Sequence, residues 1–132
     1  MAAEYKLHIN GQDYVTSENK SILRYLRDDL NLTSVKDGCS EGACGTCTII
    51  VDNQAVKSCV LTTKLAQGHD IVTIEGLTER EQEAFVYAFG TAGAVQCGFC
   101  IPGMILTAED FLKKNPNPTR DEVKLAISGN LC

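Results

Sequence analysis

The sequence of 132 residues predicts an α+β fold in two parts, a small mixed sheet with one helix and then an all-helical part. Two observations support this division: short strand-like segments separated by turn signals come first, and helical spacing of apolar residues replaces them near Gly76. We therefore expect one domain over residues 1–76 and a second over residues 77–132. A hydrophobic fraction of 44% is enough for two small domains that share an interface.

The first part contains segments typical of strands joined by tight turns. Apolar and polar side chains alternate over residues 5–9, and Asn10-Gly11 is the sequence of a two-residue hairpin turn. Apolar residues recur at helical spacing after Ser21, so a helix is expected to begin there. Three further strands are predicted at residues 48–51, 55–61 and 71–74.

The second part carries start signals for three helices. Thr78 followed by Glu81 forms a capping-box pattern, and Thr119 with Glu122 repeats it. Pro102 is suited to the first turn of another helix, where its missing N–H costs nothing. The sequence therefore predicts an all-helical second part.

Residues 84–108 carry no charged side chain, and a segment of that length could cross a bilayer. Four glycines, a proline and two cysteines interrupt it, so we predict two buried helical segments joined by a glycine-rich turn and no membrane insertion. Phe85 and Phe89 are predicted to belong to the helical core. The uncharged segment also favours burial against other subunits.

The composition excludes one class of partner and indicates a compartment. The net charge is −5 and the basic residues are scattered, so nucleic acid is not expected as a partner. The first residues lack the basic and then apolar pattern of a secretion signal, which predicts a cytoplasmic location. The seven cysteines then favour metal binding or catalysis over disulfides.

The first cysteine set has gaps of four, two and eleven residues between Cys39, Cys44, Cys47 and Cys59. The opening spacing is that of plant-type [2Fe–2S] ligation. Glycines let the backbone fold closely around a two-iron core, and this loop contains Gly38, Gly42 and Gly45. Structural zinc is the alternative, but zinc sites usually bring two close cysteine pairs together from separate turns. The spacing therefore favours an iron–sulfur cluster.

The second cysteine set consists of Cys97, Cys100 and Cys132. A Cys-x-x-Cys pair alone fits a redox dithiol or half of a zinc site equally well. Because the pair lies between two predicted helices and a third helix leads to Cys132, the set is interpreted as three ligands of a second four-ligand site. The fourth ligand is missing from the sequence.

Three segments carry recognisable motifs: residues 38–47, residues 96–104 and residues 128–132, which read GCSEGACGTC, QCGFCIPGM and SGNLC. Together they resemble the iron–sulfur part of the molybdenum hydroxylases, the family of xanthine dehydrogenase, aldehyde oxidoreductase and aerobic carbon monoxide dehydrogenase. Residues 38–47, GCSEGACGTC, are similar to the N-terminal cluster loop of that family. Residues 96–104, QCGFCIPGM, resemble its second cluster motif, and residues 128–132, SGNLC, resemble the start of its third. The resemblance covers essentially the whole chain.

The resemblance implies a β-grasp ferredoxin-like domain followed by a helical bundle, with two [2Fe–2S] clusters. It implies an electron-transfer component of an oxidoreductase, which relays single electrons from a molybdenum–pterin site through both clusters towards FAD. The molybdenum–pterin and the FAD are expected on partner subunits or domains. Gln96 is implied as a pterin contact, and no catalytic residue is expected in this chain.

The family pattern continues past Cys132 with one residue and another cysteine. We therefore expect the sequence to be a shortened portion of a longer polypeptide, with the helical bundle and the second cluster incomplete as given. Two other functions remain open at this point: a free-standing [2Fe–2S] ferredoxin and a zinc-stabilised binding module. The helical second part with its own cysteines favours the molybdenum hydroxylase component over a simple ferredoxin.

Overall fold

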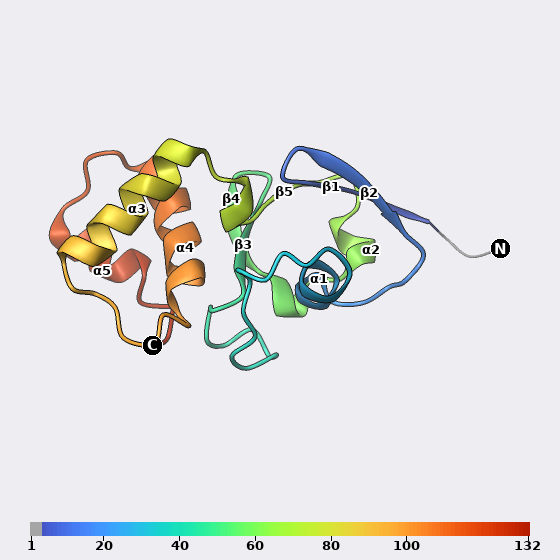
Figure 1. Ribbon diagram of the computed structural model, residues 1–132, viewed down its shortest axis with the longest axis horizontal. Helices are drawn as coiled ribbons and strands as arrows, with labels where there is room; N and C mark the ends of the chain where they lie inside the picture. Colours follow the sequence, from blue (N-terminus) through green and yellow to red (C-terminus); the bar gives the residue numbers. More distant parts are fainter. Residues whose placement is uncertain (1–3) are drawn as a thin grey trace.

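The computed structural model describes residues 4–132, over which a five-stranded mixed sheet precedes a group of helices (Figure 1). The helical part lies beside the β3–β4 side of the sheet, and the β1–β2 hairpin lies at the far end. This arrangement confirms the predicted α+β fold class. The division at residue 76 stays a prediction, and residues 1–3, used in predicting the compartment, lie outside the described residues.

The sheet has the strand order β2-β1-β5-β3-β4. Neighbouring strands pair in antiparallel fashion, except that β1 and β5 are parallel. The strands are β1 (Tyr5–Ile9), β2 (Gln12–Thr16), β3 (Thr48–Val51), β4 (Gln54–Lys57) and β5 (Asp70–Val72).

Both hairpin turns have the left-handed backbone that tight two-residue loops require. In the first turn, φ is +51° at Asn10 and +78° at Gly11. In the β3–β4 turn, φ is +49° at Asp52 and +64° at Asn53. The Asn10 side chain also accepts a hydrogen bond from the Thr73 backbone N–H at 2.9 Å, which fastens the first hairpin to the chain after β5.

One short helix covers the sheet and closes its core. The Ser21 hydroxyl caps helix α1 (Ile22–Arg24), which continues as one π-helical segment, η1 (Tyr25–Asp29). Apolar side chains from the helix and the sheet form one buried cluster that includes Leu7, Ile9, Ile22, Leu23, Leu26, Ile49 and Ile71. The helix predicted near Ser21 is confirmed.

Three short elements depart from the sequence prediction. The second strand of the β3–β4 hairpin ends at Lys57, and a 3₁₀ turn, η2 (Ser58–Val60), takes the remaining residues. The single-turn helix α2 (Thr63–Ala66) was not predicted, because four residues are too few to display a helical period. The last strand ends at Val72, and a second 3₁₀ turn, η3 (Ile74–Gly76), follows it.

The helical part consists of α3 (Glu79–Thr91), α4 (Ile101–Lys114) and α5 (Arg120–Ala126). Both predicted capping boxes form, at the starts of α3 and α5. No helix within residues 4–132 has the length and apolar character needed to span a membrane.

The prediction that residues 84–108 form buried segments is wrong for α3. None of its side chains is fully buried, and Val86 and Tyr87 are each 73% exposed. Phe85 and Phe89 are only half-buried. The reason is that α3 lies against α4 on one side, while its outer face is open to solvent in this chain (Figure 1).

Helix α4 joins the two parts by packing on the β3–β4 hairpin. At Gly103 a Cβ atom would stand 2.4 Å from the Gly45 carbonyl oxygen, so the absence of a side chain permits this close approach. Leu106 packs in a small cluster with Ile50. The Asp110 carboxylate accepts a hydrogen bond from the Ala55 N–H at 3.0 Å. The contact at Gly103 places the start of α4 against the loop that carries the first cysteines. The contacts of Leu106 and Asp110 place the rest of the helix on the hairpin.

Candidate iron–sulfur sites

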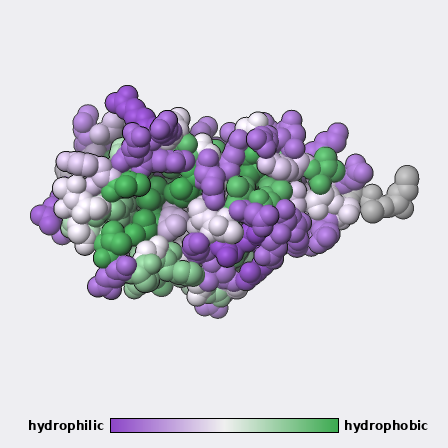
Figure 2. Space-filling model, viewed as in Figure 1, coloured by the Kyte–Doolittle hydropathy of each residue, from purple (hydrophilic) through white to green (hydrophobic). Residues whose placement is uncertain are grey.

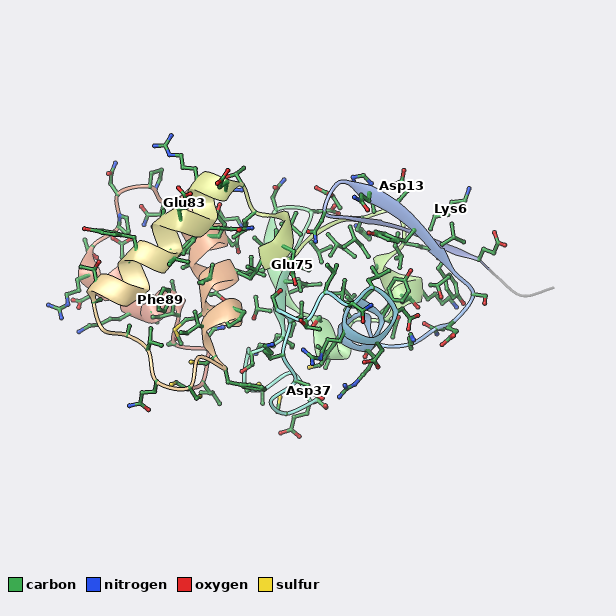
Figure 3. All side chains as sticks on the ribbon, viewed as in Figure 1. Lys6, Asp13, Asp37, Glu75, Glu83 and Phe89 are labelled. Atoms are coloured by element: carbon green, nitrogen blue, oxygen red, sulfur yellow. The ribbon has the colours of Figure 1, made fainter. Side chains whose placement is uncertain are left out.

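The first cysteine site is assembled by a projecting loop and the β3–β4 hairpin. Cys39 and Cys44 lie on the loop, which hangs from the lower edge of the molecule in Figure 1, with Asp37 labelled at its start in Figure 3. Cys47 directly precedes β3, and Cys59 follows β4 in η2. The strands pair with Thr48 opposite Lys57, so the hairpin brings these two cysteines to the same end.

The four thiols lie as two neighbouring pairs, because the Cys39 side chain interacts with that of Cys44 and the Cys59 side chain with that of Cys47. Backbone N–H groups also donate to the sulfur atoms. The Cys44 N–H donates to Cys39 Sγ at 3.3 Å, and the Cys59 N–H donates to Cys47 Sγ at 3.5 Å. The Gly42 N–H donates to Cys59 Sγ at 3.1 Å and connects the loop to the hairpin. A [2Fe–2S] cluster held by four thiolates takes two at each iron, and this pairing fits that need.

Glycines give the loop the conformation that points its N–H groups inward. Gly42 and Gly45 have φ of +77° and +76°, which other residues rarely adopt. A Cβ atom at Gly38 would stand 2.8 Å from Cys44 Sγ. Side chains at these positions would strain the loop or collide with it, so the glycines predicted to matter are required by the geometry.

The loop also favours the thiolate form of one cysteine. Backbone N–H groups of Glu41, Cys44 and Ala43 lower the pKa of the Cys39 thiol to about 7. Burial, followed by the neighbouring Cys47 thiol, raises the pKa of Cys59 to about 11. A bound cation would offset that cost by holding the thiolate. The donor set of four converging thiols and several inward N–H groups therefore fits an iron–sulfur cluster.

The arrangement differs from that of a single-ion site. Structural zinc needs four ligands around one position. Two adjacent thiol pairs suit a core with two metal atoms instead.

The second cysteine site lies between α3, the start of α4 and the end of the described chain. Cys97 and Cys100 flank a turn in which Gly98 has φ of +82°. The C-terminus lies at the lower end of α4 in Figure 1. A hollow of about 350 Å³ is lined by residues that include Phe89, Gln96, Cys97, Cys100, Met104 and Cys132. The structure thus brings the three predicted ligands of the second set together.

The side chains around this hollow clarify two predictions. Phe89, labelled on α3 in Figure 3, lines the wall of the hollow and does not belong to a closed helical core. Gln96 is exposed beside Cys97. Burial, followed by the neighbouring Cys132 thiol, raises the pKa of the Cys100 thiol. The position of Phe89 could not be predicted, because the same apolar spacing is expected for a helix that faces a core and for one that lines a hollow.

One hydrogen bond connects the two cysteine sites. The Leu131 N–H donates to the Cys44 carbonyl oxygen at 2.7 Å. Leu131 directly precedes Cys132 of the second set, and Cys44 belongs to the first. No sequence pattern predicted this contact, because the two residues are far apart along the chain.

The two parts of the chain match two iron–sulfur families. Residues 7–71 match the family described as "2Fe-2S iron-sulfur cluster binding domain", and residues 73–132 match "[2Fe-2S] binding domain". The nicotinate dehydrogenase small FeS subunit of Eubacterium barkeri is 49% identical over 129 residues, which cover 96% of this chain and 82% of that protein. The chain belongs to the iron–sulfur subunits of the molybdenum hydroxylase family.

Further relatives agree with this assignment. The xanthine dehydrogenase iron-sulfur-binding subunit of Escherichia coli O157:H7 is 41% identical over 113 residues, covering 83% of this chain and 71% of that protein. Among solved structures, quinoline 2-oxidoreductase from Pseudomonas putida 86 matches with a TM-score of 0.88 and 38% identity, over 98% of this chain and 82% of that one. These matches confirm the family predicted from the cysteine motifs.

Membership in the family establishes the general role of this iron–sulfur subunit. It is an electron-transfer component of an oxidoreductase, and its two matched domains correspond to two [2Fe–2S] clusters. Its relatives are small subunits of larger enzymes, so it works with partner chains. The free-standing ferredoxin is the less supported function.

Proposed function

We propose that this subunit relays single electrons from a molybdenum–pterin site, through the second cysteine site and then the first, towards FAD on partner subunits. The observation that carries this proposal is the hydrogen bond from Leu131 N–H to the Cys44 carbonyl. It forms a short covalent and hydrogen-bonded route from a cysteine of the second set to a cysteine of the first. When bound, each cluster accepts and releases one electron at a time.

In this proposal Cys39, Cys44, Cys47 and Cys59 hold the first [2Fe–2S] cluster. The two-pair arrangement and the inward N–H groups support the assignment. Cys97, Cys100 and Cys132 supply ligands to the second cluster, which is supported by their placement around one hollow. The division into an electron-carrying sheet domain over residues 1–76 and a helical domain over residues 77–132 follows from this assignment of ligands.

The polypeptide tunes the first cluster through its backbone. N–H groups that donate to ligand sulfurs stabilise negative charge, and a cluster gains negative charge when it is reduced. The donors at Glu41, Ala43 and Cys44 all reach Cys39 Sγ, at 3.5, 3.3 and 3.3 Å. We therefore assign to this part of the loop a role in raising the reduction potential of the first cluster.

The exposed apolar surface of the helical part supports a partner that covers it. Figure 2 shows hydrophobic residues gathered over this half of the molecule. Val86 and Tyr87 on α3 and Leu125 on α5 are between 73% and 76% exposed, the highest values among the large apolar side chains of residues 4–132. We assign this face to the molybdenum-binding subunit, with Gln96 positioned to donate or accept a hydrogen bond at the pterin.

The names of the relatives suggest a substrate class for the partner. Nicotinate, nicotine and quinoline are the substrates named for three of the similar proteins, and all three are N-heterocycles. We therefore propose an N-heterocyclic compound as the substrate of the molybdenum subunit. This chain has no role in binding it in our proposal.

The proposal is tested by replacing one cysteine in each site within the native complex prepared without oxygen. We expect Cys47→Ser to abolish one of two [2Fe–2S] signals in electron paramagnetic resonance and Cys97→Ser to abolish the other. Each change should block the passage of electrons from substrate to acceptor, because the relay needs both clusters. Iron and acid-labile sulfide should fall in parallel with each signal.

Two outcomes would contradict the proposal. If each replacement left both signals intact, the ligand assignment would be wrong. If the native complex contained zinc and no iron in this subunit, the whole relay would be wrong. Ser40→Ala, a change in the same loop that removes no thiol, serves as the control and should keep both signals.

A further inference from the structure

Asn130 lies two residues before Cys132 of the second cysteine site, and its side chain contacts the loop of the first site. It follows α5 and a turn in which its backbone N–H donates to the Ile127 carbonyl at 3.0 Å. Its side-chain amide donates to the Gly45 carbonyl at 3.1 Å, across 85 residues of sequence. The next residue, Leu131, donates its N–H to the Cys44 carbonyl. Two consecutive residues therefore hold two consecutive carbonyl groups of the first cysteine loop.

The Gly45 carbonyl is fixed from both sides. Within its own domain it accepts hydrogen bonds from the Thr48 N–H at 3.1 Å and from the Thr48 hydroxyl at 2.6 Å. The Asn130 amide is the donor that reaches it from the helical part. The carbonyl thus ties the start of β3 to the segment that carries Cys132.

The fit around this contact is tight. A Cβ atom at Gly45 would stand 2.9 Å from the Gly129 carbonyl oxygen and 3.0 Å from the Asn130 amide nitrogen. On the other side, a Cβ atom at Gly103 would stand 2.4 Å from the Gly45 carbonyl oxygen. The backbone at Gly45 is therefore held between the first turn of α4 and residues 129–131, with no room for a second position.

We infer that Asn130 is a positioning residue: its side chain holds the segment before Cys132 in a fixed position against the first cysteine loop, so that the Leu131–Cys44 hydrogen bond persists. The inference rests on the proposed relay, whose route passes through that hydrogen bond. The chemistry favours asparagine, because its neutral amide donates to a carbonyl, whereas an aspartate of the same shape would place negative charge against the Gly45 oxygen.

The test compares Asn130→Ala and Asn130→Asp in the native, iron-loaded complex. Both variants should retain the iron and sulfide of the parent protein. The magnetic interaction between the two reduced clusters, seen as splitting in low-temperature electron paramagnetic resonance, should decrease. Hydrogen exchange of the Leu131 N–H should accelerate roughly fivefold, the equilibrium equivalent of one ordinary hydrogen bond.

A matched control is available in the same part of the chain. Asn115 also donates its side-chain amide, to the Glu122 carboxylate at 2.9 Å, and that pair joins only helical segments. Asn115→Ala should leave both the splitting and the exchange of the Leu131 N–H as they are in the parent.

The outcomes separate this inference from the proposed function. Parent-like splitting and exchange in Asn130→Asp would overturn the inference, because that variant keeps the side-chain volume while it loses the donor and adds a negative charge. Failure to find two clusters in the parent complex would instead contradict the proposed relay, whatever the variants do.

Discussion

The sheet part and the helical part of this subunit support their cysteines in different ways. Around the sheet, apolar side chains such as Leu7, Leu23 and Ile49 form a closed core with exposures of 0–1%. Within helices α3 to α5 of the described chain, Leu106 is the only large apolar side chain that is fully buried. Leu106 itself packs against the sheet part. The first site therefore rests on a core of its own, whereas the second rests on contacts made by one helix.

This difference indicates how each site is kept in order. Burial of apolar surface stabilises the sheet part without help from a cofactor or a partner. The helical part leaves large apolar side chains in solvent, so we expect its packing to be completed by the cluster and by partner chains.

The largest effect is expected from a cavity in the core of the sheet part. Leu23 is 1% exposed, and Leu23→Ala should lower the free energy of unfolding by about 2–5 kcal/mol. Leu125 on α5 is 76% exposed, and Leu125→Ala should change the free energy of unfolding by no more than about 0.5 kcal/mol. Denaturant unfolding of the isolated subunit measures the free energy of both variants. Equal losses of stability in the two would mean that the sheet part has no better-packed core than the helical part.

A smaller effect is expected where the two parts meet. A Cβ atom at Gly103 would collide with backbone, so Gly103→Ala should cost about 1–3 kcal/mol and loosen the helical part from the sheet. Gly90 lies inside α3 with nothing within 4 Å of the same atom. Gly90→Ala should therefore stabilise the subunit by about 0.5–1 kcal/mol, because alanine favours a helix.

Thermal unfolding of the two glycine variants should shift in opposite directions. The sheet part should retain its first cluster in both. A stabilising Gly103→Ala would mean that the contact between α4 and the Gly45 carbonyl is not close in solution.

The smallest effect concerns a pair of carboxyl groups between α3 and α4. Burial, followed by the nearby Glu81, raises the pKa of Glu109 on α4. A hydrogen bond from Glu109, followed by one from Thr78, lowers the pKa of Glu81 to about 2. Lys113 approaches both carboxylates, at 3.3 Å from Glu109 and 4.0 Å from Glu81.

The sign of the pH effect follows from the raised pKa of Glu109. The folded state binds this proton more tightly than the unfolded state, so stability decreases as pH rises from the ordinary carboxyl pKa through the raised one. Glu109→Gln removes that loss and should stabilise the helical part at pH 7 relative to the parent, and less so at pH 4. Thermal unfolding at both pH values measures the difference.

A control for this change lies on the same helix as Glu81. Glu83 is exposed on α3, and Glu83→Gln removes a carboxylate from that helix outside the Glu81–Glu109 pair, so it serves as the control. If Glu109→Gln behaved like Glu83→Gln, the carboxyl pair would not be coupled.

Features that depend on a few neighbouring residues could be predicted before the chain was seen folded. The Asn10-Gly11 turn, the Ser21 cap and the two capping boxes were predicted because each is decided by groups within four positions of one another. The spacing of Cys39, Cys44 and Cys47 likewise predicted a cluster loop, because the three cysteines share one short segment, and the resemblance of three cysteine-containing segments predicted the family.

Features that join distant segments of the chain became visible only in the folded molecule. The parallel pairing of β1 with β5, the exposure of α3 and the place of Phe89 beside the second site depend on how whole elements pack. The hydrogen bonds from Leu131 to Cys44 and from Asn130 to Gly45 are of the same kind. Backbone carbonyls carry no sequence signature, so contacts between them and a residue 85 positions away become visible only when the chain is folded.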